Sequence, residues 1–129
     1  MRTLHIGLVC NSEQNADRFY RDLLGLAKQD PKTIPAAIVK PLFGMDSSLS
    51  AVNYIGTDLH AEVFIATTPR PAPERISHTC LEVENADELL DQATSSGFTV
   101  SRIPKGDGNI LFLDDLDGNR FEIKQRISK

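Results

Sequence analysis

The fold is decided by a pattern that begins at residues 4–9, LHIGLV, and begins again at residues 76–83, ISHTCLEV. Both segments are typical of β-strands. Each is followed by a capping residue, an apolar stripe at helical spacing and a terminating glycine, which is Gly25 in the first half and Gly97 in the second. From the histidine of each strand to its glycine the interval is 20 residues and 19 residues. The chain therefore reads as a duplication.

Three further strand-like segments follow the glycine in each half. In the second half they are residues 98–103, 110–113 and 120–125, separated by turns at 104–109 and 117–119. In the first half they are residues 26–29, 49–55 and 59–67. We therefore predict an α+β fold in which two paired β-α-β-β-β modules form a curved mixed sheet.

The first half also contains an additional stretch, residues 30–48, that is rich in proline. We expect a loop there, with one helical turn near residues 36–42. Such an insertion is either a binding element or a surface excursion. We predict a single domain over residues 1–129, with modules 1–68 and 75–129 joined by an extended, proline-rich linker at 69–74.

Composition excludes several classes of protein. The chain has 129 residues and a formal net charge of −4 without a basic stripe, so nucleic acid and anionic membranes are poor partners. No apolar run approaches the length of a membrane span, and we expect no signal peptide. The 2 cysteines are too few for a disulfide framework, which predicts reduced thiols and a cytoplasmic location.

Strand periodicity places a histidine and a glutamate on the same side of each predicted sheet, opposite the side that helices cover. These residues are His5 with Glu62, and His78 with Glu122. If the last strand of each module returns beside the first, the two side chains become neighbours. Two imidazoles and two carboxylates form a good divalent-metal site, and the donor set suits nickel, cobalt, zinc, manganese or iron.

A lone strand histidine is more often solvated than a ligand, and it is the matched occurrence in both halves that favours a metal. His60 is a competing ligand on the same side as Glu62, but Arg120 occupies its equivalent place in the second half. Cys80 lies two residues from His78 and could line the site, ligate a softer metal or fill the interior, and a small buried filler is the favoured interpretation.

Short motifs give the chain a family resemblance. Residues 4–9 with 16–20 and 24–26 resemble the opening of the vicinal oxygen chelate superfamily, which includes glyoxalase I, bleomycin resistance proteins and extradiol dioxygenases. Residues 115–123, DLDGNRFEI, resemble its closing motif, in which the glutamate is a metal ligand. The resemblance implies a homodimer in which each site takes one half from each chain or both from one.

The ligand order His, Glu, His, Glu is similar to that of glyoxalase I (lactoylglutathione lyase). This implies a lyase or isomerase that forms an enediolate from a small vicinal-oxygen substrate such as a thiol hemiacetal. Glu122 is the favoured base and Glu62 is chemically equivalent. Lys105 matches a substrate-binding lysine of the family, whereas Val9 stands where glutathione-binding members carry arginine. The alternatives are an extradiol-type dioxygenase and a non-catalytic, drug-binding protein.

Overall fold

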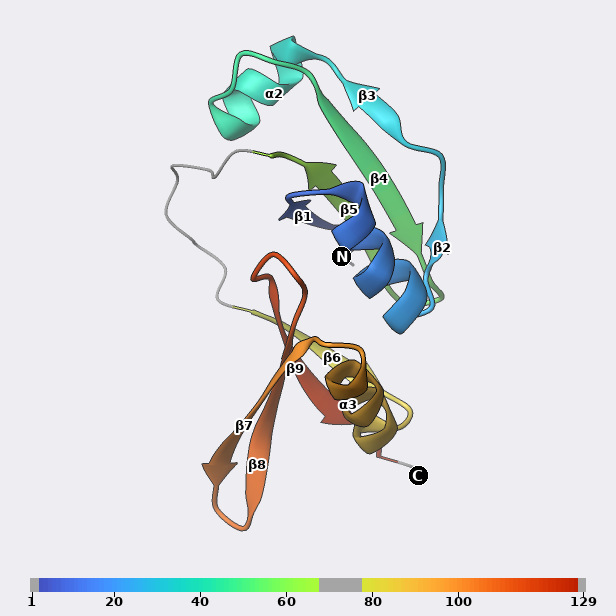
Figure 1. Ribbon diagram of the computed structural model, residues 1–129, viewed down its shortest axis with the longest axis vertical. Helices are drawn as coiled ribbons and strands as arrows, with labels where there is room; N and C mark the ends of the chain where they lie inside the picture. The colour runs from blue at the N-terminus through green and yellow to red at the C-terminus, as the bar shows by residue number, and fades with distance from the viewer. Residues whose placement is uncertain (1–2, 68–77, 128–129) are drawn as a thin grey trace. The chain divides into compact units, whose positions relative to one another are not determined.

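The computed structural model describes residues 3–67 and 78–127, and its backbone forms two compact units, Met1–Pro73 and Glu74–Lys129 (Figure 1). Each unit contains a mixed β-sheet with at least one helix, which confirms the α+β class. Residues 69–74, for which the sequence predicts an extended linker, lie outside the described residues.

The sheet of the first unit has the strand order β1-β5-β4-β2, with β3 also paired to β4. Its strands are Ile6–Cys10 (β1), Ala27–Lys28 (β2), Lys32–Ile34 (β3), Leu49–Ile55 (β4) and His60–Ile65 (β5). As expected, the last strand returns beside the first, because β5 pairs with β1 in parallel while its pairing with β4 is antiparallel.

The helical segment of the first unit covers one side of this sheet. It consists of α1 (Glu13–Ala16) and a wider helix of π type, η1 (Asp17–Leu23). The Ser12 hydroxyl accepts a hydrogen bond from the Asn15 amide and caps the start, as the sequence predicts. Gly25 ends the segment with φ of 73°, a left-handed conformation that favours glycine.

The insertion at residues 30–48 is more ordered than the sequence indicates. The helical turn expected near residues 36–42 is an eight-residue helix, α2 (Ala36–Phe43), and the stretch before it contains strand β3 where only a loop was expected. The prolines suggested a loop, but Pro35 precedes the first helical residue, where it is well tolerated. Val39 faces inward and packs with Leu49 and Ala66, so burial of an apolar cluster stabilises the helix despite Pro41.

The second unit is a plain β-α-β-β-β module with the strand order β6-β9-β8-β7. Its elements are Thr79–Val83 (β6), Ala86–Ser95 (α3), Thr99–Lys105 (β7), Gly108–Asp114 (β8) and Arg120–Gln125 (β9). Again the last strand pairs in parallel with the first. Asn85 caps α3 by accepting from the Glu88 amide, and α3 packs against β7 and β9 (Figure 1).

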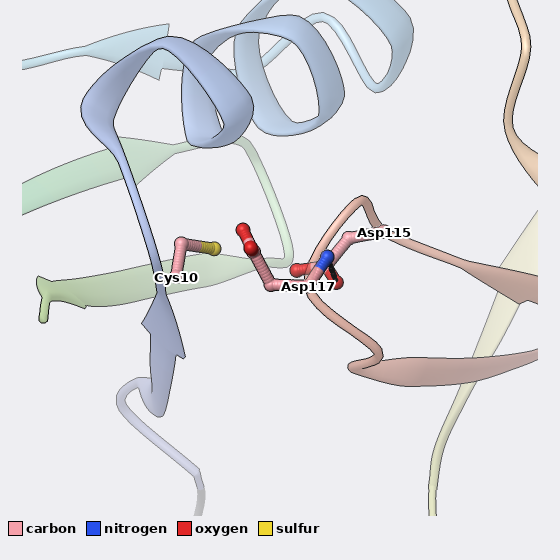
Figure 2. Close-up of side chains that lie close together, drawn as sticks. All are labelled: Cys10, Asp115 and Asp117. Atoms are coloured by element: carbon pink, nitrogen blue, oxygen red, sulfur yellow. Dashed lines mark hydrogen bonds between the residues drawn. The ribbon is translucent and has the colours of Figure 1, made fainter. Parts of the chain in front are cut away.

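Two connections in the second unit determine where its strands end. The predicted turn at residues 104–109 is shorter than expected: Pro104 pairs with Asn109 and Lys105 with Gly108, so the hairpin extends almost to its tip. The connection from β8 to β9 follows the prediction and is organised by Asp115, shown with Asp117 in Figure 2. Its buried carboxylate accepts hydrogen bonds from the Asp117 amide at 2.9 Å and from the backbone and side chain of Asn119 at 2.9 and 2.7 Å.

Candidate functional site

The parallel pairing of β1 with β5 makes His5 and Glu62 neighbours. Gly7 lies opposite Glu62 in the register, and His5 immediately precedes β1 on the same side of the sheet. The distance from His5 Nε2 to Glu62 Oε1 is 3.8 Å, and the two side chains are 48% and 28% exposed. A polar pair therefore lies open on the side opposite the buried Ala61 and Val63.

The second unit repeats this arrangement. Cys80 lies opposite Glu122 in the parallel register of β6 and β9, and His78 immediately precedes β6. His78 Nε2 lies 3.3 Å from Glu122 Oε1, with the two side chains 35% and 19% exposed. The buried neighbours Phe121 and Ile123 point to the other side of the sheet. Each half thus brings its predicted histidine and glutamate together.

The spacing within each pair fits shared coordination of a metal ion. Two ligand atoms bound at adjacent octahedral positions, each about 2.1 Å from the ion, lie about 3.0 Å apart. The observed separations of 3.8 and 3.3 Å exceed this value by less than an ångström. Nitrogen and carboxylate oxygen donors also suit first-row divalent ions. The donor chemistry of both pairs is therefore compatible with a divalent metal.

The surroundings of the two pairs differ, although the pairs match. In the first half, the His60 ring lies 5.5 Å from the His5 ring, centroid to centroid, and its Nε2 is 2.6 Å from Asn53 Oδ1. Asn53 lies opposite Glu62 across β4 and β5. Sequence reasoning missed Asn53, because only the register of these strands, and no local pattern, places it there.

In the second half an aromatic ring occupies the corresponding place. Phe112 lies opposite Glu122 across β8 and β9, and its ring meets the His78 ring edge-on at 5.4 Å. Arg120, which the sequence places at the position equivalent to His60, is paired with Asp114 at 3.1 Å and stacks over Phe112. Polar groups therefore surround the first pair, and an aromatic–cation cluster borders the second.

Two other candidate residues lie differently from the expectation. Cys80 is exposed, so the prediction of a buried filler is wrong. Its side chain is on the open side of the sheet with Glu122. The buried cysteine is Cys10, whose side chain is drawn in Figure 2. Lys105 is exposed at the tip of the β7–β8 hairpin. It lies four residues along β7 from Ser101, the residue that pairs with Phe112, and four residues of a strand span about 13 Å. Its role in substrate binding remains a prediction.

Comparison with known proteins identifies the family. The chain belongs to the Glyoxalase/Bleomycin resistance protein/Dioxygenase superfamily, whose family model matches residues 2–123. This confirms the resemblance that the short motifs indicated. One curated relative is an iron-dependent extradiol dioxygenase from Rhodococcus jostii, 33% identical over 95 residues. The match covers 69% of this chain, and the chain spans only 30% of the length of that relative.

Solved structures of the superfamily share the fold. A glyoxalase family protein from Enterococcus faecalis superposes with a TM-score of 0.72 at 18% identity, with 95% of each chain covered. The trypanothione-dependent glyoxalase I of Leishmania major gives 0.61 at 21% identity, covering 97% of this chain and 86% of the other. The fosfomycin resistance protein FosX from Listeria monocytogenes gives a TM-score of 0.69 at 14% identity, covering 98% of this chain and 94% of the other.

Among the described residues, no helix is long and apolar enough to span a bilayer.

Proposed function

We propose that this chain is a metal-dependent isomerase or lyase of the glyoxalase I type, acting on a small substrate with two adjacent oxygens. The observation that carries this proposal is the matched His–Glu pair in each half, at 3.8 and 3.3 Å. His5, Glu62, His78 and Glu122 are the proposed ligands of one divalent ion, the two pairs coming from one chain or from two. Membership of the superfamily and the donor chemistry support this choice.

A divalent ion bound by these groups would act as a Lewis acid that lowers the energy of negative charge on the substrate oxygens. The residues of the chain supply the proton transfers. We propose that Glu122 takes the proton from the carbon next to a carbonyl and returns it to the neighbouring carbon. The reaction is then an isomerisation, without net oxidation. Lys124 Nζ lies 3.9 Å from Glu122 Oε2, so a cation lies beside the Glu122 carboxylate whenever that carboxylate carries no proton.

The first test is metal content. Purified protein loaded with nickel, cobalt, zinc, manganese or iron and then desalted should retain one ion per two His–Glu pairs. Replacement of either histidine by alanine should lower that stoichiometry strongly, because it removes one nitrogen donor. Two ions per chain would mean that each pair binds alone, and retention of less than a tenth of an equivalent would remove the basis of the proposal.

The second test addresses the proton transfer. Methylglyoxal is mixed with a series of thiols in deuterated water, and exchange of the substrate proton is followed by NMR. Glu122→Gln should abolish exchange while some metal remains bound, because the amide is still a weak oxygen ligand but cannot accept a proton. Glu82→Gln is the matched control, because Glu82 is an exposed strand glutamate that is paired with Arg126. Unchanged turnover in Glu122→Gln would refute the assignment of the base.

The extradiol dioxygenase function is a second candidate, favoured by the 33% identity to the Rhodococcus jostii dioxygenase. It differs in a measurable way, because oxygen would be consumed when the iron-loaded protein meets a catechol. It also requires only three protein ligands, so one of the two glutamates would be replaceable without loss of iron. Oxygen uptake with catechol, measured beside the exchange assay on the same preparation, separates the two functions.

A further inference from the structure

We propose that His60 is a further substrate-binding residue, whose Nδ1 accepts a hydrogen bond from a substrate hydroxyl next to the metal-binding oxygens. The substrate class then narrows to molecules that carry a hydroxyl on the carbon adjoining the vicinal oxygens. This inference rests on the proposed function, because it requires the substrate to bind beside His5 and Glu62.

The hydrogen bond to Asn53 fixes which nitrogen of His60 is available. His60 Nε2 and Asn53 Oδ1 are 2.6 Å apart. An amide oxygen can only accept, so in the tautomer that makes this bond Nε2 donates and Nδ1 keeps its acceptor lone pair. Among the described residues, this ring also lies against the ring of His5, and no donor forms a hydrogen bond with Nδ1. No described residue therefore competes with a ligand for this acceptor.

The position of His60 is fixed by groups that are themselves held in place. Asn53 is only 8% exposed, and its backbone carbonyl accepts a hydrogen bond from the Gln29 amide at 2.8 Å. The next residue, Tyr54, is buried on the other side of β4 and donates to Asp17 at 2.8 Å. Because Asn53 cannot move freely, the ring that it holds is a preorganised acceptor, which lowers the entropy cost of binding a donor.

The acceptor lies beside the proposed ligands. His60 and Glu62 are two residues apart on β5 and so share one side of the sheet, and the His60 ring centroid is 5.5 Å from that of His5. In the second half the equivalent position holds Arg120, which has no acceptor and is paired with Asp114. The two halves thus offer different groups to a substrate, and a hydroxyl would be directed to the first half.

Two substitutions separate substrate contact from support of Asn53. His60→Asn places an amide group at the same number of bonds from the backbone as Nδ1, so it keeps an acceptor for the substrate and loses the bond to Asn53. His60→Gln reaches as far as Nε2, so its amide N–H can keep the bond to Asn53 while no acceptor remains at the position of Nδ1. Acetohydroxamate and glycolohydroxamate, which chelate through two adjacent oxygens and differ by one hydroxyl, are the probes.

Binding of both probes to the metal-loaded protein is measured by titration calorimetry, together with metal content. We expect glycolohydroxamate to bind about three- to tenfold more tightly than acetohydroxamate to the wild type, the gain of one hydrogen bond. His60→Asn should keep most of this ratio, and His60→Gln should reduce it to about one. All three proteins should retain the same amount of metal.

Several outcomes would overturn the inference. A ratio of one in the wild type means that no such hydroxyl contact forms, and a ratio kept by His60→Gln but lost in His60→Asn means that His60 only supports Asn53. Equal loss of metal in both variants would make His60 a ligand instead. A wild-type protein that binds neither metal nor probe contradicts the proposed function itself, whereas a metal-loaded protein with equal affinity for both probes contradicts only the role of His60.

Discussion

Tyr54→Phe tests how the helical layer of the first unit is tied to strand β4. The Tyr54 ring is fully buried, and its hydroxyl donates to Asp17 Oδ1 at 2.8 Å. Lys28 Nζ also binds Asp17, at 3.0 Å, and Glu13 at 2.7 Å. A hydrogen bond to a charged group contributes about 1.5–3 kcal/mol. Because Asp17 keeps Lys28 after the substitution, we expect a loss near the lower limit, about 1.5 kcal/mol at pH 7.

The same substitution should change the pH dependence of stability. Burial, and then the hydrogen bond to Asp17, raises the pKa of Tyr54 far above its ordinary value of 10.0. Above pH 10 the unfolded tyrosine therefore loses its proton while the folded one retains it. The free energy of unfolding then falls by about 1.4 kcal/mol per pH unit for this group. The stability that Tyr54 provides is complete below pH 10 and is lost as the pH rises.

Lys28 titrates in the same range and must be separated from Tyr54. Its hydrogen bond to Glu13, and that to Asp17, raise the pKa of Lys28 above 10.5, so its contribution is also lost at high pH. This contribution is present in the wild type and in Tyr54→Phe alike. The difference between the two proteins therefore reports Tyr54, and Lys28→Met in both backgrounds is the control.

Urea unfolding at pH 7, 9, 10 and 11 gives the required free energies. We expect the wild type to be more stable by about 1.5 kcal/mol up to pH 9, and the difference to vanish near pH 11. Parallel curves, with a constant difference up to pH 11, would show that the tyrosine ionises equally in both states. They would refute the claim that burial and Asp17 hold its proton.

Three further predictions concern the metal and the turn before β9. Divalent metal at 100 times its dissociation constant should raise the free energy of unfolding by about 2.7 kcal/mol, and a chelator should remove this gain in a thermal scan. Gly118→Ala should cost about 1–2 kcal/mol, because φ at Gly118 is 87°. Gly108→Ala is its control in urea unfolding and should change stability by less than about 0.5 kcal/mol, since a Cβ there meets no described atom within 4 Å. Asp115→Ala removes the acceptor of three turn hydrogen bonds and should cost about 3 kcal/mol, with reduced metal retention, if that turn positions Glu122.

The duplicated elements were predictable because local chemistry determines them. Ser12 and Asn85 are residues that cap helices, and Gly25 and Gly97 adopt the positive φ that ends them. Period-two alternation also placed each histidine on the same side as its glutamate. At these positions the backbone conformation depends on a few neighbouring residues, so the sequence alone is sufficient to predict it.

Features that depend on tertiary packing were predicted less well. The prolines of residues 30–48 indicated a loop with a single helical turn, but burial of Val39 stabilises the longer helix α2 around Pro41. Cys80 was expected to be buried because cysteine usually is, yet its side of β6 is open. Asn53 lies near Glu62 only because of the β4–β5 register, which follows from how strands pair and not from the residues next to it.

The repeated register explains why the two halves match at the pairs and differ around them. In each half the first and last strands pair in parallel, so a histidine before the first strand meets a glutamate on the last. The residue opposite that glutamate belongs to a different strand, so the parallel pairing does not determine which residue it is. It is Asn53 in one half and Phe112 in the other. Asn53 forms a hydrogen bond with an imidazole, whereas the Phe112 ring packs against one. The two pairs therefore have chemically different surroundings. The first pair is thus bordered by an imidazole, His60, and the second by a guanidinium, Arg120, because these neighbours are set by side-chain identity and not by the repeated register.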